Sequence, residues 1–164
     1  MDADIIGFVI WQLDDGNNCT MRKIESYETT LPPFRPSLVC SYDLSPDRKF
    51  LIMSDFFGGL YAHNLEIPES TPMVLQAPDK VANEEKCVTC LAFSGDGHRL
   101  CYHCDGSIII RFVDHGFCMS NRHMFTDQIG AMCFNWTGST IFFCPQADDE
   151  EEMDVYELDI DTNV

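Results

Sequence analysis

The chain has 164 residues, 45% of them hydrophobic, which is enough to bury the core of one domain and too apolar for a disordered chain. Its 27 Asp and Glu against 10 Lys and Arg give a formal net charge of −17, so nucleic-acid phosphates and anionic membrane surfaces repel it. No apolar run reaches the roughly 18 residues that span a bilayer, and no basic segment precedes the N-terminal apolar stretch, which argues against a secretory signal.

An apolar strand is predicted at residues 7–14, and a more divergent strand follows at residues 20–27. Three later segments share one pattern, in which an apolar strand, a short polar turn and a second apolar strand follow one another. These segments are residues 39–52, 88–101 and 129–142. Aligned without gaps, they bring apolar residues into register on each side of the turn: Leu44, Phe93 and Phe134 before it, and Leu51, Leu100 and Ile141 after it.

A third strand is predicted after each hairpin, at residues 59–65, 107–113 and 153–158, and outer strands at residues 73–77 and 117–125. Four strands in a repeat of about 40 to 50 residues are typical of a β-propeller blade. The sequence therefore predicts one all-β domain over residues 1–164. Its expected parts are the end of one blade at 1–28, blades at 37–77 and 87–125, and an incomplete blade at 129–160.

Several short motifs resemble the WD40 repeat family. They are the turns Leu44-Ser-Pro-Asp47 and Phe93-Ser-Gly-Asp-Gly97, the hairpin Asp105-Gly-Ser-Ile108 and the strand end Val9-Ile-Trp-Gln-Leu-Asp14. No blade ends in Trp-Asp, and no Gly-His precedes a first strand. The resemblance implies a partial WD40-like β-propeller with about three four-stranded antiparallel blades plus a leading strand pair. It also implies a non-enzymatic protein–protein interaction platform, a scaffold or adaptor subunit.

A more specific resemblance covers one blade. Residues Pro36–Ser45, Leu51–Asp55 and Leu60–Tyr61 look like a blade of the propeller in the mRNA-decapping scaffold of the enhancer-of-decapping family. This resemblance implies an alternative function, in which the chain is a fragment of such a scaffold and acts in mRNA decay.

The predicted blades are too few for a closed ring of about 4 to 8 blades. An open sheet edge exposes unpaired backbone groups that can pair with further strands. We therefore expect the chain to be a segment of a longer propeller, or to complete its ring with a second copy or another protein.

The nine cysteines are an odd number without an export signal, which favours reduced thiols in the cytoplasm, or in the nucleus, over a secreted protein. Cys87, Cys90, Cys101 and Cys104 have the spacing of a zinc ribbon, so a small zinc-binding protein is a further alternative. Buried thiols are the competing interpretation, because residues i and i+3 of a regular strand point to opposite faces.

Trp136 lies in the predicted turn at residues 135–139, in register with Pro46 and Gly95. It is a candidate anchor for a protein partner, with packing back onto its own blade as the alternative. No sequence motif indicates a nucleophile–base pair or a phosphate-binding loop, so we expect neither an enzyme nor a cofactor.

The acidity is concentrated near the C-terminus, because residues 148–164 carry nine acidic and no basic side chains and so contribute −9 of the −17. The acidic run is predicted to be either a solvated loop or a docking site for a basic partner. It consists of Asp148, Asp149, Glu150, Glu151 and Glu152. The terminal Thr162-Asn163-Val164 also fits a ligand of a PDZ domain.

Overall fold

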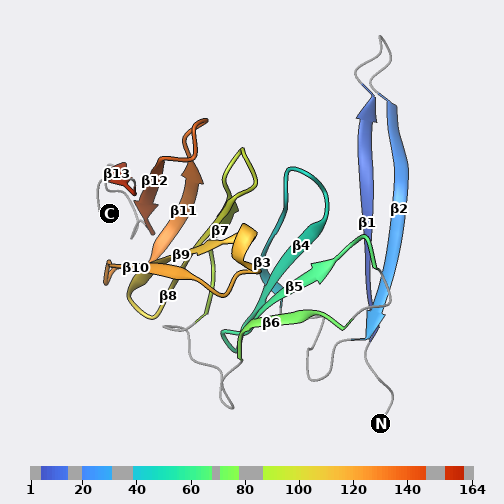
Figure 1. Cartoon of the computed structure of the whole chain (residues 1–164), viewed down its shortest axis with the longest axis horizontal. Helices are drawn as coiled ribbons and strands as arrows, with labels where there is room; N and C mark the ends of the chain where they lie inside the picture. Colours follow the sequence, from blue (N-terminus) through green and yellow to red (C-terminus); the bar gives the residue numbers. More distant parts are fainter. Residues whose placement is uncertain are drawn as a thin grey trace.

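The computed structural model describes residues 5–14, 20–30, 39–67, 71–77, 87–146 and 154–160, with side chains from residue 39 onward. Every regular element in these ranges is a β-strand apart from η3, a short 3-10 turn at Val113–His115. The strands pair in antiparallel fashion and form four separate sheets (Figure 1). The all-β fold class predicted from the sequence is therefore confirmed. The part of the chain that the structure describes holds no helix with the length and hydropathy that crossing a membrane requires.

The sheets follow one another along the chain. The N-terminal sheet is a hairpin of β1 (Ile5–Asp14) and β2 (Thr20–Thr30). Sheet 1 contains β3 (Val39–Leu44), β4 (Phe50–Asp55), β5 (Leu60–Asn64) and β6 (Met73–Gln76). Sheet 2 contains β7 (Leu91–Phe93), β8 (Arg99–Cys104), β9 (Ser107–Phe112) and β10 (Ser120–Met124). Sheet 3 contains β11 (Ile129–Phe134), β12 (Thr140–Pro145) and β13 (Tyr156–Asp159).

The second strands of sheets 1, 2 and 3 are mostly apolar on both of their faces, unlike the alternating pattern of a half-exposed strand. In β4, for example, Leu51, Ile52 and Met53 are all buried although they point alternately to opposite faces. Polar turns punctuate these apolar runs and connect neighbouring strands at each end of the sheet. Local pattern and turn chemistry therefore account for the strands.

Strand β7 is shorter than the sequence predicts, since it begins at Leu91 rather than at Val88. The backbone carbonyl of Val88 accepts a hydrogen bond of 2.6 Å from the Ser54 hydroxyl of sheet 1, so it serves the contact between sheets rather than a ladder within one. The equivalent places in β3 and β11 also carry irregularities of register. The predicted outer strand at 117–125 is shortened to β10 because η3 and a left-handed turn at Gly116 and Phe117 come before it.

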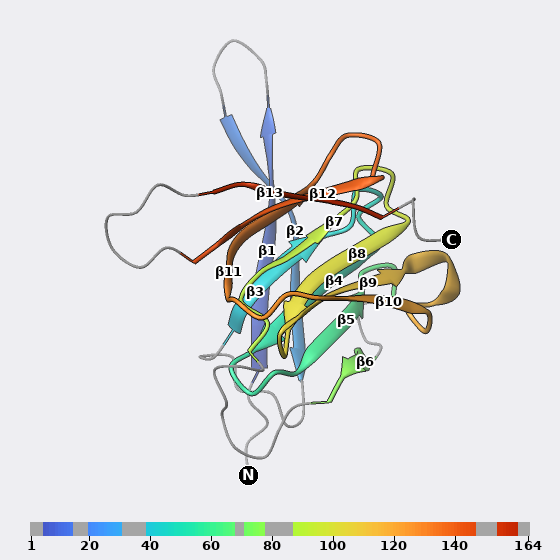
Figure 2. The same ribbon diagram turned by 90° about the vertical axis from the view of Figure 1, so that its left-hand side faces the viewer.

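Sheet 2 lies between sheets 1 and 3, and the three sheets pack face to face in a row (Figure 1). Figure 2 views this row from the end that sheet 3 forms. One apolar cluster joins sheets 1 and 2, with Ile52 and Leu60 against Leu100 and Tyr102. A second cluster joins sheets 2 and 3 around Cys101, Ile108, Ile110, Ile141 and Phe143. Each buried interface holds its two sheets together through the hydrophobic effect.

Candidate interaction surfaces

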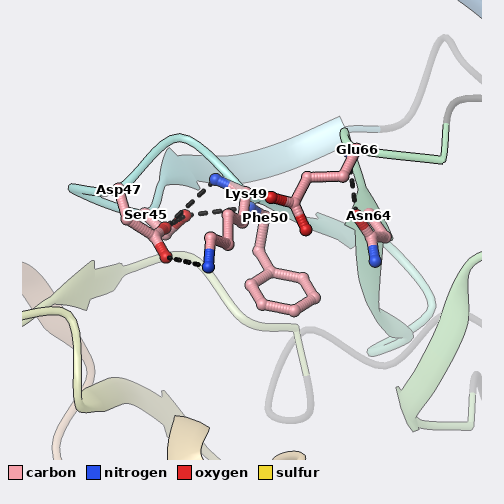
Figure 3. A network of polar contacts seen from close by, with 6 residues as sticks. All are labelled: Ser45, Asp47, Lys49, Phe50, Asn64 and Glu66. Carbon is pink, nitrogen blue, oxygen red and sulfur yellow. Dashed lines mark hydrogen bonds and ion pairs between the residues drawn. The ribbon is translucent and has the colours of Figure 1, made fainter.

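In each of sheets 1, 2 and 3, a turn connects the first two strands. The three turns lie side by side at the same end of the strands, uppermost in Figure 1. In the first turn, the Ser45 hydroxyl donates to Asp47 Oδ1 at 2.7 Å and accepts from the Phe50 N–H at 2.8 Å (Figure 3). Asp47 Oδ1 also accepts the Lys49 N–H at 3.1 Å. Beside this turn, the Glu66 N–H donates to Asn64 Oδ1 at 2.9 Å. The short polar side chains thus satisfy the backbone N–H groups of the bend.

The second turn repeats this design. The Ser94 hydroxyl donates to Asp96 and accepts from the Arg99 N–H at 2.9 Å, and Asp96 accepts the His98 N–H at 3.0 Å. In the third turn, Asn135 replaces the serine and accepts the Thr140 N–H at 3.2 Å. The turns predicted from the repeated Ser-x-Asp pattern are therefore stabilised by that pattern itself.

The two turn aspartates are held in their charged form. A hydrogen bond from the Ser45 hydroxyl is the main cause that lowers the pKa of Asp47 from 3.8, with a further contribution from the Lys49 N–H. Partial burial acts to raise the pKa of Asp96, but the hydrogen bonds from Ser94 and the His98 N–H outweigh it and the pKa is lowered. These charged carboxylates lie beside the cationic side chains of Lys49 and Arg99 in the same turns, so their charge is largely offset.

The three turns also contact one another. A Cβ atom on Gly97 would lie 3.7 Å from the Pro46 ring, and one on Gly138 would lie 3.3 Å from Asp96 Oδ2. The Arg99 guanidinium of sheet 2 donates to the Gly138 carbonyl of the third turn. We call this continuous surface the turn row. Trp136 projects from it with 90% of its surface exposed, so it does not pack back onto its own blade.

Asp55 lies at the other end of strand β4, away from the first turn. Its buried carboxylate accepts hydrogen bonds from the Phe57 N–H at 2.9 Å, the Gly59 N–H at 2.7 Å and the Tyr61 hydroxyl at 2.9 Å. Burial is the main cause that raises the pKa of Tyr61, and the Asp55 hydrogen bond adds to it. A cavity of about 220 Å³ opens beside this turn. It is lined by Phe57, Gly58, Gln76, Ala77, Cys104, Asp105 and Arg122.

The predicted acidic docking site, residues 148–152, lies outside the described residues, as does the terminal segment 162–164. The described chain leaves β12 at Gln146 and resumes at Asp154. These points lie at the far end of β12 from Trp136, roughly 20 Å away for a strand of this length. Trp136 and the attachment points of the acidic run therefore belong to opposite ends of the sheet.

Sheet 3 presents a second apolar face on the side that points away from sheet 2. Its members Cys133 and Phe142 pair across β11 and β12, and Ala131 pairs with Cys144. With Val155, which is 72% exposed, they line a shallow concavity of about 180 Å³. We call these five residues the outer face of sheet 3. Sequence reasoning overlooked this face, although its signal was present in the alignment that puts Phe142 in register with Cys101.

The structure separates the four cysteines of the predicted zinc ribbon. Cys90 and Cys101 belong to the cluster between sheets 2 and 3, whereas Cys104 belongs to the cluster between sheets 1 and 2. Cys87 lies beside Cys40, with 3.1 Å between their sulfur atoms. Within the described ranges, no three His, Cys, Asp or Glu side chains are placed so that they could share a metal ion. Zinc binding by this set thus gains no support from the geometry.

No protein-family model matches the sequence, and a search of the curated proteins also finds no match. Solved structures do resemble the fold. The β-propeller domain of Cps50 (Swd1) from Myceliophteria thermophila has a TM-score of 0.55 and 17% identity, with 76% of this chain and 40% of that chain covered. The RRP9 WD40 repeats have a TM-score of 0.52 and 15% identity over 65% of this chain and 32% of that one. The structure of U3-55K gives a TM-score of 0.52 and 16% identity over 65% and 33%.

This chain has a partial β-propeller fold, similar to that of these WD40 structures. The resemblance to WD40 repeats that the sequence motifs indicated is thereby confirmed at the level of the fold. The chain spans less than half the length of each of these solved propellers. The resemblance of residues 36–61 to a decapping scaffold finds no support in these matches and stays a prediction.

Proposed function

We propose that the chain is a non-enzymatic protein–protein interaction module whose outer face of sheet 3 docks a second copy of the chain. One observation carries this proposal. Positions that a neighbouring sheet covers in sheets 1 and 2 hold apolar residues in sheet 3 as well, but there the side chains are exposed or half-buried. Ile52 in sheet 1 and Cys101 in sheet 2 are 0% exposed, and each faces the next sheet of the row. Their equivalent in sheet 3, Phe142, is only half-buried.

The neighbours of these residues support the same comparison. Cys90 is buried against sheet 3, whereas its equivalent Ala131 is exposed. Ala92 is partly covered by sheet 3, whereas its equivalent Cys133 is exposed. A contiguous exposed apolar patch of this kind marks an interaction site. Its shape and register are those of the two sheet contacts already present, so another sheet is the expected occupant.

A second copy is the simplest source of that sheet. Each chain contributes three sheets of three or four strands and one two-stranded hairpin, so two chains contribute six such sheets, within the range of about 4 to 8 blades in closed propellers. Tyr42, in register with the buried Leu91 and Met132, is 72% exposed on the face of sheet 1 that points away from sheet 2, but Leu51 and Met53 on that same face are buried. Docking of the second copy therefore rests on the outer face of sheet 3 and not on sheet 1.

Charge opposes this pairing, because each copy carries a formal charge of −17. Salt screens repulsion between surface charges and strengthens apolar contact. The dimer should therefore become more stable as the salt concentration rises, which separates an apolar interface from one built on ion pairs.

The test is sedimentation equilibrium of the full chain at low and high salt. The wild type should be a dimer whose dissociation constant falls with salt. Cys133→Arg places a charge on the outer face of sheet 3 and should give a monomer with an unchanged melting temperature. The matched control Asn121→Arg adds the same charge to the exposed strand β10 and should leave the dimer intact. A wild type that stays monomeric at high salt, or a Cys133→Arg variant that still dimerises, would overturn the proposal.

A second partner site on the turn row is favoured by the exposure of Trp136. A tryptophan that is exposed in the free protein and becomes buried at the centre of an interface contributes strongly to protein binding. A protein captured by the wild type and by Asn121→Arg, but not by an equally stable Trp136→Ala variant, would support this site. Retention of every captured protein by Trp136→Ala would remove it.

The remaining proposals rest on the sequence alone. The nine cysteines favour a reducing compartment, so we propose a cytoplasmic location, with the nucleus as the alternative. A role in mRNA decay requires that decapping factors co-purify with the chain. Zinc content near zero in protein purified without chelators would end the zinc alternative.

A further inference from the structure

Cys40 and Cys87 come from segments far apart in the sequence and meet where sheet 1 contacts sheet 2. Cys40 lies in β3, and Cys87 lies in the segment that leads into β7. Their sulfur atoms are 3.1 Å apart, only about 1 Å more than the bond length of a disulfide. The sulfur atoms would have to approach by only about 1 Å to reach bonding distance.

The two thiols differ in their access to solvent. Cys87 is 6% exposed, and its sulfur lies 3.8 Å from the backbone carbonyl oxygen of Asp55. Cys40 is only half-buried, so a small oxidant reaches it first. Burial is the main cause that raises the pKa of Cys87 to about 12, and the hydrogen bond to Cys40 adds to it. Cys87 is therefore protected from reagents in solution yet adjacent to the accessible sulfur.

We propose that Cys40 and Cys87 form a reversible disulfide that ties sheet 1 to sheet 2 when a disulfide oxidant such as glutathione disulfide is present. The Cys40 thiolate attacks one sulfur of glutathione disulfide and releases the first glutathione as a thiolate. The Cys87 thiol then loses its proton, its sulfur attacks the Cys40 sulfur, and the second glutathione leaves. The two protein thiols lose two electrons and two protons in total, and one glutathione disulfide becomes two molecules of glutathione.

The bond would close a loop that contains β4, β5, β6 and the Asp55 turn. In the chain-entropy treatment, a closed loop of this length stabilises the fold enough to raise the melting temperature by roughly 10 °C. The bond would also fix sheet 1 on sheet 2 at the ends of the strands that lie away from the turn row. Oxidation therefore changes the rigidity of the contact between sheets without touching the outer face of sheet 3.

The test is to incubate the full chain in glutathione buffers of increasing oxidised fraction, block free thiols, digest without reduction and map the cross-linked peptides. We expect an intramolecular Cys40–Cys87 peptide and a parallel rise in melting temperature, both reversed by dithiothreitol. Cys40→Ser and Cys87→Ser should each abolish both effects. The control variant Cys118→Ser removes an exposed thiol outside the outer face of sheet 3 and should keep both effects.

Two results would overturn the proposal. In the first, Cys40 and Cys87 remain reduced under buffers that glutathionylate the exposed Cys118. In the second, Cys40 ends as a stable mixed disulfide with glutathione while Cys87 stays reduced. If either serine variant folds poorly, peptide mapping of the wild type alone still decides between these results and the expected one.

Discussion

Removal of the Arg111 guanidinium should weaken the contact between sheets 1 and 2 more than loss of any exposed charge. Arg111, in β9, donates from Nε to the Tyr102 hydroxyl at 3.0 Å and from Nη1 to the Phe117 carbonyl at 2.7 Å. Its Nη2 crosses to sheet 1 and donates to the Leu75 carbonyl at 2.8 Å. Tyr102 and Phe117 are almost completely buried, so water cannot easily replace the lost donor.

A hydrogen bond to a charged group contributes about 1.5 to 3 kcal/mol, and the three bonds share one guanidinium, so their contributions overlap. We expect Arg111→Ala to lower the free energy of unfolding by about 3 to 5 kcal/mol. For a chain of this size, that corresponds to a fall in melting temperature of about 6 to 20 °C. Arg111→Lys keeps the charge but can reach fewer acceptors, so it should recover less than half of the loss.

Thermal unfolding followed by circular dichroism and by calorimetry measures this effect, with urea titration as a second estimate of the free energy. Arg122→Ala, on the exposed strand β10 of the same sheet, is the matched control and should leave the melting temperature almost unchanged. If Arg111→Ala and Arg122→Ala melt together within error, water satisfies the three acceptors and the reasoning fails.

Three further predictions concern other positions in the sheets. Burial lowers the pKa of His63 below 6.5, so the unfolded chain binds a proton that the folded chain excludes, and stability falls as the pH drops below about 6.5. Urea titrations at about pH 7 and pH 5 should show this loss in the wild type and a smaller one in His63→Gln; equal losses would refute it. A Cβ atom on Gly59 would overlap the Tyr61 hydroxyl, so Gly59→Ala should cost about 2 kcal/mol in chemical denaturation. Ile141→Ala, at a fully buried site between sheets 2 and 3, should lower the free energy of unfolding by about 2 to 5 kcal/mol. Phe142→Ala on the outer face of sheet 3 should lower that of the monomer by less than half as much. Equal losses would show that the two faces of β12 are equally covered.

The strands and their register were predictable from local patterns. The gap-free alignment of Leu51, Leu100 and Ile141 works because strand side chains alternate with a period of two and the intervening turns have equal length. All three residues are buried facing the preceding side of the row. The fold class followed from this repetition, since each repeat is one sheet that buries its faces against its neighbours.

Features that depend on contacts between distant segments were not predictable. The late start of β7 depends on the Ser54 hydroxyl, which lies 34 residues before Val88. The exposure of Trp136 could not be predicted from the sequence of its turn, because it depends on how the turn of sheet 2 packs beside that turn. No local pattern indicates that Cys40 meets Cys87, which follows 47 residues later. The zinc-ribbon spacing was a misleading signal of the same kind, since the sheets place the four thiols in different clusters.

The central position of sheet 2 has a consequence for how the molecule opens. Sheets 1 and 3 each pack against it, and among the sheets whose side chains the structure describes it is the one that contributes to both apolar clusters. In such a linear array, stability is transmitted through nearest neighbours, and the terminal members detach first. Amide hydrogens of β8 and β9 should therefore exchange with solvent most slowly, because they are released only when the whole array melts. Sheet 2 should therefore stay folded when sheet 1 or sheet 3 unfolds locally, and it provides the surface on which the unfolded sheet packs again.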